Sequence, residues 1–183
     1  MIKGKKVLLR KIRDEDWEMF EKWGESRDAL WGPYQRFQID HLPLLKEAYQ
    51  KTGLISRDGG ILMIERLDDQ QVVGFVRFSM LSIPDSDCPC PEIGFGVPDQ
   101  SARGKGYGKE GLALLLEYLF SGYPTERIAA FTDVENIPAQ NLMKRLGFQQ
   151  EGVLRRSMFR DGEWRDVAIY GVLRSEWGEI NGT

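Results

Sequence analysis

Residues 97–109 read Val97-Pro98-Asp99-Gln100-Ser101-Ala102-Arg103-Gly104-Lys105-Gly106-Tyr107-Gly108-Lys109, between a strand-like segment and a leucine-rich helical segment. Three glycines alternate with lysine and tyrosine where the helix is expected to begin, and glycine lets a ligand approach backbone N–H groups closely. A helix N-terminus adds free N–H donors and the positive end of its dipole. This pattern predicts a cradle for a pyrophosphate group, with added positive charge from Arg103, Lys105 and Lys109.

Two well-known phosphate-binding loops do not fit this stretch. A P-loop ends in Gly-Lys-Ser/Thr, and that ending is missing here. A dinucleotide-binding fingerprint needs a different spacing of its third glycine and lies near the start of a chain of βαβ units. The remaining alternative is a flexible basic loop that binds no ligand.

The segments around the loop alternate between strand-like and helix-like patterns, which predicts one mixed α/β domain over residues 1–183. Asp14 is expected to cap the first helix, Gly147 to end the last one, and Asp161-Gly162 to form a hairpin turn. The expected strands are 7–12, 61–66, 72–81, 92–97, 128–132, 148–160 and 164–174, and the expected helices begin near 14, 42, 109 and 139.

Composition narrows the class of protein. A net charge of −3 gives no global basic field for nucleic acid, and no apolar run approaches the roughly 20 residues that span a bilayer. The first residues lack the apolar core of a secretory signal, so a cytoplasmic location is expected. Cys88 and Cys90 have the wrong spacing and too few partners for a zinc site. His41 is the only histidine, which disfavours a Ser-His-Asp hydrolase.

Arg103-Gly104-Lys105-Gly106-Tyr107-Gly108 resembles the Arg/Gln-x-x-Gly-x-Gly/Ala signature of the GNAT acetyltransferase superfamily. The resemblance extends over nearly the whole chain and is closest to the ribosomal-protein-alanine N-acetyltransferase-like branch. Three further segments carry it, in the expected order: Val7-Leu8-Leu9-Arg10 followed by Asp14-Glu15-Asp16; Asn136-Ile137-Pro138-Ala139 followed by Leu146-Gly147-Phe148; and Trp164-Arg165-Asp166 through Leu173-Arg174-Ser175-Glu176-Trp177.

The resemblance implies a GNAT fold, with a twisted, mostly antiparallel mixed sheet of about seven strands and helices on both faces. Two neighbouring parallel strands, 92–97 and 127–132, are expected to splay apart and admit the pantetheine arm of acetyl-CoA. Backbone groups of Phe95, Gly96 and Val97 are then expected to pair with the pantetheine amides, as a free strand edge can. No metal ion is expected.

The resemblance also implies transfer of the acetyl group to a primary amine by direct attack. Lysine-like amines have a pKa of roughly 10.4, so a base is needed near neutral pH. Glu92 is the expected base, acting through water, and the alternative is a solvated carboxylate at a strand edge. Relatives often protonate the leaving thiolate with a tyrosine where this chain has Met143, which carries no proton donor. The groups that could replace this tyrosine as the proton donor are Asn141, Ser157, Tyr170 or a water molecule.

Asn136, Asn141 and Lys144 are expected to reach acetyl-CoA, although Asn136 also suits a helix cap and Lys144 a solvated helix face. The acceptor amine is expected to contact residues 31–57 and the last hairpin, with Trp31, Tyr34 and Phe37 or the acidic Asp40, Asp85 and Asp87 as candidates. A protein N-terminus and a small amine such as a polyamine, amino sugar or antibiotic remain open. The alternative class is a non-catalytic acyl-CoA-binding sensor. Relatives in the family are often homodimers, and the oligomeric state of this chain stays open.

Overall fold

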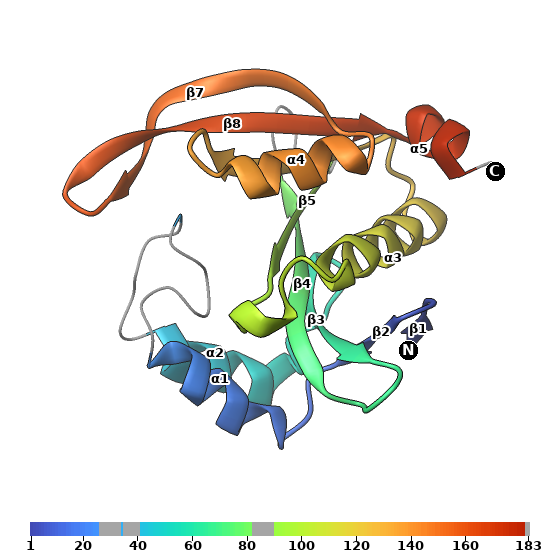
Figure 1. Ribbon diagram of the computed structural model, residues 1–183, viewed down its shortest axis with the longest axis vertical. Coiled ribbons are helices and arrows are strands. Elements are labelled where there is room, and N and C mark those ends of the chain that lie inside the picture. The colour runs from blue at the N-terminus through green and yellow to red at the C-terminus, as the bar shows by residue number, and fades with distance from the viewer. Residues whose placement is uncertain (26–33, 35–40, 82–89, 182–183) are drawn as a thin grey trace.

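The computed structural model describes residues 1–25, 34, 41–81 and 90–181 (Figure 1). The strands are β1 (Ile2–Lys3), β2 (Val7–Lys11), β3 (Gly59–Arg66), β4 (Val72–Leu81), β5 (Cys90–Gly96), β6 (Arg127–Asp133), β7 (Gln149–Arg160) and β8 (Glu163–Leu173). The helices are α1 (Asp16–Gly24), α2 (His41–Thr52), α3 (Tyr107–Gly122), α4 (Ile137–Arg145) and α5 (Arg174–Asn181), with a short 3₁₀ turn, η1 (Gln100–Ala102), before α3.

All eight strands join one sheet in the order β1-β2-β3-β4-β5-β6-β8-β7. Every neighbouring pair is antiparallel except β5 and β6, which are parallel. The expected mixed α/β fold with a mostly antiparallel sheet is therefore confirmed. The strand beyond the expected seven is β1, whose two residues are too few to show a periodic pattern.

The two faces of the sheet carry different helices, because successive side chains of a strand point to opposite sides. Leu62 and Ile64 of β3 belong to the core under α3, whereas Met63 between them packs with residues of α1. Figure 1 shows α3 on one side of β3 and β4, and α1 and α2 on the other side of these strands. The smaller cluster is rich in aromatic side chains: Trp17, Phe20, Trp23 and Phe75.

The parallel pair β5–β6 opens partway along its length. Its register contains only two pairs, Glu92 with Ala129 and Ile93 with Ala130. Beyond them, 94–96 stay paired with β4 and 131–133 stay paired with β8, yet the two segments do not pair with each other. This is the splayed parallel pair that the family resemblance implies, with its parting point at Ile93.

A glycine in β4 permits this course of β5. A Cβ built on Gly74 would lie 2.2 Å from the carbonyl oxygen of Gly96 and 3.3 Å from the Cα of Val97. Backbone atoms cannot yield as the end of a flexible side chain can, so only glycine fits at this position. The end of β5 therefore lies tightly against β4, on the side away from β6.

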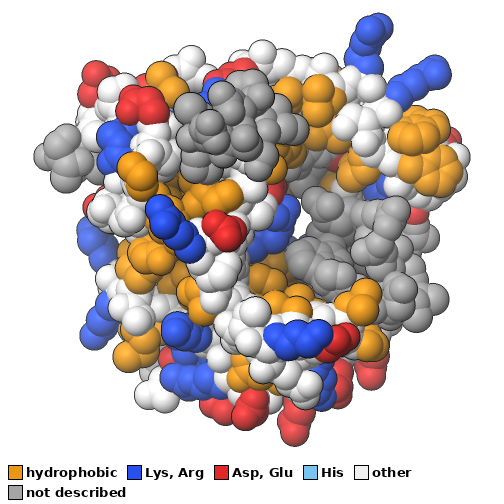
Figure 2. Space-filling model, turned by 180° about the vertical axis from the view of Figure 1, so that it is seen from behind, with side chains coloured by type: hydrophobic (Ala, Val, Ile, Leu, Met, Phe, Trp, Pro, Cys, Tyr) orange, Lys and Arg blue, Asp and Glu red, His pale blue; other side chains and the backbone are white. Residues whose placement is uncertain are grey.

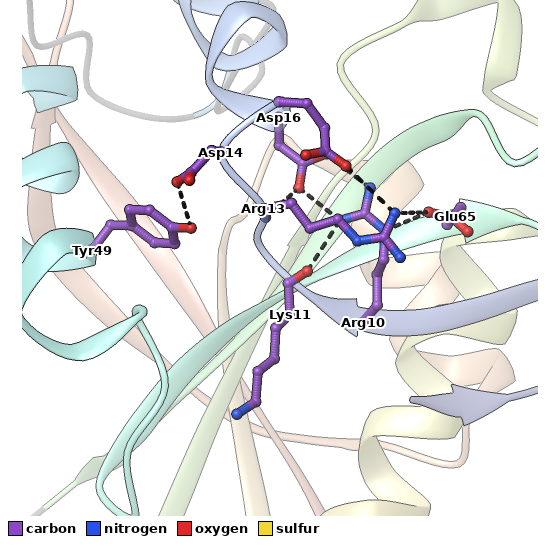
Figure 3. A network of polar contacts seen from close by, with 8 residues as sticks. Arg10, Lys11, Arg13, Asp14, Asp16, Tyr49 and Glu65 are labelled. Carbon is purple, nitrogen blue, oxygen red and sulfur yellow. Dashed lines mark hydrogen bonds and ion pairs between the residues drawn. The ribbon is translucent and has the colours of Figure 1, made fainter.

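The start of α1 is fixed by a buried ion-pair network and not by a cap at Asp14 (Figure 3). The helix begins at Asp16, whose two carboxylate oxygens accept from the guanidinium of Arg10 at 2.6 and 2.8 Å. Arg10 also donates to Glu65 of β3. The hydrogen bond to Asp16 is the main cause that raises the pKa of Arg10 above its ordinary value. The expectation for Asp14 is wrong because its side chain instead accepts from the hydroxyl of Tyr49 at 2.9 Å.

The last hairpin turns where the sequence predicts, and a C-terminal helix that was not predicted, α5, follows β8. Asp161 and Gly162 both have positive φ, 56° and 80°, as a tight two-residue hairpin turn requires. Arg174 then donates to the carbonyl oxygens of Tyr123 at 2.9 Å and Thr125 at 2.6 Å, just after α3 ends. The characteristic ending of the sequence thus fastens the C-terminal end of α3 to β8.

Candidate active site

The first feature of the site is a row of free backbone N–H groups at the start of α3. Gly106 precedes the helix with a φ of 89°, and Gly104 has a φ of 75°. The first helical bond runs from the N–H of Glu110 to the carbonyl of Gly106 at 3.0 Å. The backbone N–H groups of 104–109 donate to no acceptor among the residues that the structure describes. The geometry is that of an anion-binding loop, with N–H donors at the positive end of a helix.

Side chains from distant segments hold this loop in place. The carboxylate of Glu110 accepts from the backbone N–H groups of Lys5 and Lys6 in the turn between β1 and β2. Arg66 lies over the ring of Tyr107, 5.5 Å from its centroid. These contacts fix the direction of the first turn of α3, and with it the direction of the free N–H groups.

Of the three basic residues expected to add charge, Arg103 has an internal partner. Its Nε donates to the carbonyl of Val97 at 2.8 Å, and an Nη donates to that of Pro98 at 3.2 Å. Arg103 therefore ties the end of β5 to the loop before α3. Lys105 and Lys109 are exposed, and neither forms an ion pair with a described residue.

Glu92 is buried at the point where β5 and β6 are still paired. Its carboxylate accepts from both Nη atoms of Arg77 at 2.8 and 2.9 Å and from the hydroxyl of Ser79 at 3.1 Å, both residues of β4. Arg77 is two residues from Phe75, so these side chains lie on the sheet face that carries α1. The alternative of a solvated strand-edge carboxylate does not describe Glu92.

On the opposite face, neither Met143 nor Tyr170 supplies a free acid. Met143 is buried in the core with residues of α3. Tyr170 is fully buried, and its hydroxyl donates to the side-chain oxygen of Gln140 at 3.0 Å. Burial raises the pKa of Tyr170, which makes it a weaker proton donor.

The residues expected on α4 lie on its outer side and at its start. Asn136 caps the helix, since its side-chain oxygen accepts from the N–H of Ala139 at 3.3 Å, as the alternative for this residue predicts. Its amide NH₂ stays available to a ligand. Asn141 and Lys144 are exposed.

Ser157 lies away from this group, on the edge strand β7. Its segment forms a bulge, because three residues of β7 between Leu154 and Met158 stand opposite one residue of β8. Two strands separate β7 from β5, which puts them roughly 14 Å apart at ordinary strand spacing. The structure does not bring Ser157 next to Glu92.

Most of the expected acceptor-binding residues, namely Trp31, Phe37, Asp40, Asp85 and Asp87, lie outside the described residues. Tyr34 is described, and its ring lies 5.4 Å from the guanidinium carbon of Arg160. That guanidinium is paired with Asp133 at the end of β6. From behind the view of Figure 1, Figure 2 shows a hollow with Lys, Arg, Asp and Glu side chains near it.

The sequence model of the acetyltransferase (GNAT) domain family matches residues 6–149 of this chain. The chain belongs to the GNAT acetyltransferase family. The uncharacterized N-acetyltransferase YokL, derived from the SPbeta prophage of Bacillus subtilis, is 33% identical over 185 residues and covers 97% of this chain and 95% of its own. The ribosomal protein uS5-alanine N-acetyltransferase of Escherichia coli is 25% identical over 94% of this chain and 90% of its own.

The GNAT fold is also that of a solved spermidine N-acetyltransferase from Vibrio cholerae, in complex with CoA and spermine. It superposes with a TM-score of 0.76 over 95% of this chain and 99% of its own, at 22% identity. GNAT enzymes take their acetyl group from acetyl-CoA. No helix in the described residues is long and apolar enough to cross a membrane. The same residues contain no group of three or more His, Cys, Asp or Glu side chains placed to hold a metal ion.

Sequence reasoning missed three residues that shape this GNAT site. Gly74, Arg77 and Ser79 all lie on β4, which carries no family motif. Gly74 was detectable as a glycine inside a strand, which marks a close backbone approach. Arg77 and Ser79 contact Glu92 only through the register of β4 against β5, and that register is not readable from a local pattern.

Proposed function

We propose that this protein transfers the acetyl group of acetyl-CoA to a primary amine by direct attack. The observation that carries the proposal is the opening of β5 from β6 beyond Ile93, next to the unpaired N–H groups of 104–109. A strand edge and an anion cradle side by side suit a ligand with an amide-bearing arm and a pyrophosphate.

Acetyl-CoA fits the residues that are present. The N–H groups of 104–109 would hold the pyrophosphate, and glycines at Gly104 and Gly106 leave room there, since a Cβ at Gly104 would meet nothing within 4 Å. Lys105 and Lys109 would add positive charge. Backbone groups of Phe95, Gly96 and Val97 would pair with the pantetheine amides. Additional contacts would come from α4, through the free amide of Asn136 and the exposed Asn141 and Lys144.

The chemistry requires a neutral amine, whose nitrogen forms a bond to the acetyl carbon while the carbon–sulfur bond breaks. The amine gives up a proton, which Glu92 would accept through a water molecule. The thiolate of CoA leaves with the electron pair of the broken bond and takes a proton from solvent. A dedicated acid is not assigned, because Met143 has no proton to give and the hydroxyl of Tyr170 is bonded to Gln140.

Two acceptor classes are supported by relatives of the chain. The uS5-alanine enzyme of Escherichia coli supports a protein N-terminus, and the spermidine enzyme of Vibrio cholerae supports a small polyamine. From the family we further infer a homodimer. A cytoplasmic location is part of the same proposal, and the net charge of −3 makes nucleic acid an unsuitable partner.

The test is thiol release from acetyl-CoA across a panel of amines that includes spermidine and a peptide with an N-terminal alanine. At least one amine should raise thiol release and gain an acetyl group. Glu92→Gln should lower kcat by about 100-fold or more, the usual contribution of a general base, with CoA binding retained. Glu126→Gln, which changes an exposed glutamate, is the matched control. If CoA binds and no amine raises thiol release, the protein is an acyl-CoA-binding sensor.

A further inference from the structure

We propose that Arg77 is a positioning residue that orients the carboxylate of Glu92 toward the acceptor amine; this rests on the proposed function. The guanidinium of Arg77 makes two parallel bonds to the two carboxylate oxygens, at 2.8 and 2.9 Å. Such a planar fork fixes the orientation of a carboxylate as well as its position. The hydroxyl of Ser79 adds a third bond at 3.1 Å.

The register of the sheet builds this arrangement. Ser79 is directly opposite Glu92, and Arg77 is opposite Gly94, so the guanidinium reaches diagonally across Gly94 to the carboxylate. A Cβ on Gly94 would lie 2.8 Å from the Nε of Arg77 and 3.2 Å from its guanidinium carbon. The absence of a side chain at Gly94 therefore leaves room for the Arg77 side chain. Gly94 also lies where β5 separates from β6.

The three bonds decide which way Glu92 can act. An ionised carboxylate offers about four lone-pair sites, and Arg77 and Ser79 fill three of them. One site remains to accept a proton through water. Arg77 thus limits Glu92 to a single direction of proton transfer, whereas a lysine, as a point charge without a fork, would not hold both oxygens.

The chain contains a matched control for a purely structural ion pair. Arg127 and Glu151 form an equally bidentate pair, at 2.8 and 2.6 Å, on other strands of the same sheet. The side chains of Arg77 and Arg127 are 37% and 38% exposed. Replacing either arginine removes a bidentate ion pair from an equally exposed guanidinium, but the carboxylate of Glu92 is 10% exposed and that of Glu151 is 37% exposed. The melting temperature of each variant is therefore measured beside its kinetics, and only one of these pairs includes the proposed base.

The experiment measures steady-state kinetics of acetyl transfer for Arg77→Met, Arg77→Lys and Arg127→Met, with the best amine from the panel. Arg77→Met should lower kcat about 10- to 100-fold, as a misplaced catalytic group does, with KM for acetyl-CoA within about twofold of wild type. Arg77→Lys should be intermediate, and guanidinium added to an Arg77→Ala variant should restore part of kcat. Arg127→Met should stay within about twofold of wild type.

A double variant separates action through Glu92 from other roles. In the Glu92→Gln background, Arg77→Met should lower kcat by less than about twofold more, because the group it orients is already gone. The proposal is overturned if Arg77→Met loses no more than Arg127→Met, if the loss appears only in KM for acetyl-CoA, or if the two effects multiply in the double variant. A wild-type protein without any amine-dependent thiol release would instead refute the acetyltransferase function itself.

Discussion

Gly106→Ala tests anion binding at the start of α3 separately from the stability of the fold. Gly106 has a φ of 89°, and a Cβ there would have only the Nζ of Lys6 within 4 Å, at 3.9 Å. Alanine therefore causes no clash, and its cost comes from the left-handed backbone, about 1–2 kcal/mol. For a domain of this size that cost lowers Tm by roughly 2–8 °C. Gly162→Ala is the matched control, with a φ of 80° and nothing within 4 Å.

The two variants should differ only in CoA binding. The methyl group of Gly106→Ala would stand in the space beside the first N–H groups of α3, where the pyrophosphate would bind. Loss of one hydrogen bond to a charged group costs about 1.5–3 kcal/mol, which is roughly 10- to 100-fold in Kd. Calorimetric titration with CoA should show this loss for Gly106→Ala and a Kd within about twofold of wild type for Gly162→Ala. Equal CoA affinities in two variants of equal Tm would refute the claim that the N–H groups at the start of α3 bind the pyrophosphate.

Two further changes test the framework around the site. Asp16→Ala should lower the free energy of unfolding by about 3 kcal/mol or more, because it breaks a buried pair with Arg10, whereas Glu15→Ala, which removes a 70% exposed carboxylate, should change it by less than about 0.5 kcal/mol. Equal denaturant midpoints would contradict this account of α1. Gly74→Ala should destabilise the protein by about 1–3 kcal/mol and weaken CoA binding, since its Cβ would overlap the carbonyl of Gly96; unchanged melting and titration curves would show that the close approach is unimportant.

Structural features that depend only on neighbouring residues in the sequence were predictable. The turn at Asp161-Gly162 and the free helix start at Gly106 depend on residues next to one another. The role of Asn136 as a helix cap was also predictable from local sequence, because a cap needs only the next turn of helix. Asp14 was the wrong cap because a buried ion pair between Asp16 and Arg10 decides where α1 begins.

Features that depend on register were not predictable in the same way. Glu92 could be chosen because the family resemblance implies a glutamate at the start of the strand 92–97, but its partners on β4 follow from how two strands align. The same holds for Gly74, whose need for a missing Cβ comes from the carbonyl of Gly96. Family resemblance supplied the parting of β5 from β6, which no pattern of hydrophobic residues indicates.

The most direct test of the central claim is amide hydrogen exchange measured with and without CoA. The account predicts slower exchange with CoA at two separated segments, 94–97 and 104–109, because the first would pair with pantetheine and the second would donate to the pyrophosphate. Exchange at the hairpin turn, Asp161-Gly162, should not change. CoA binding that leaves 94–97 and 104–109 unprotected, or that protects other segments in their place, would contradict the site assigned to acetyl-CoA.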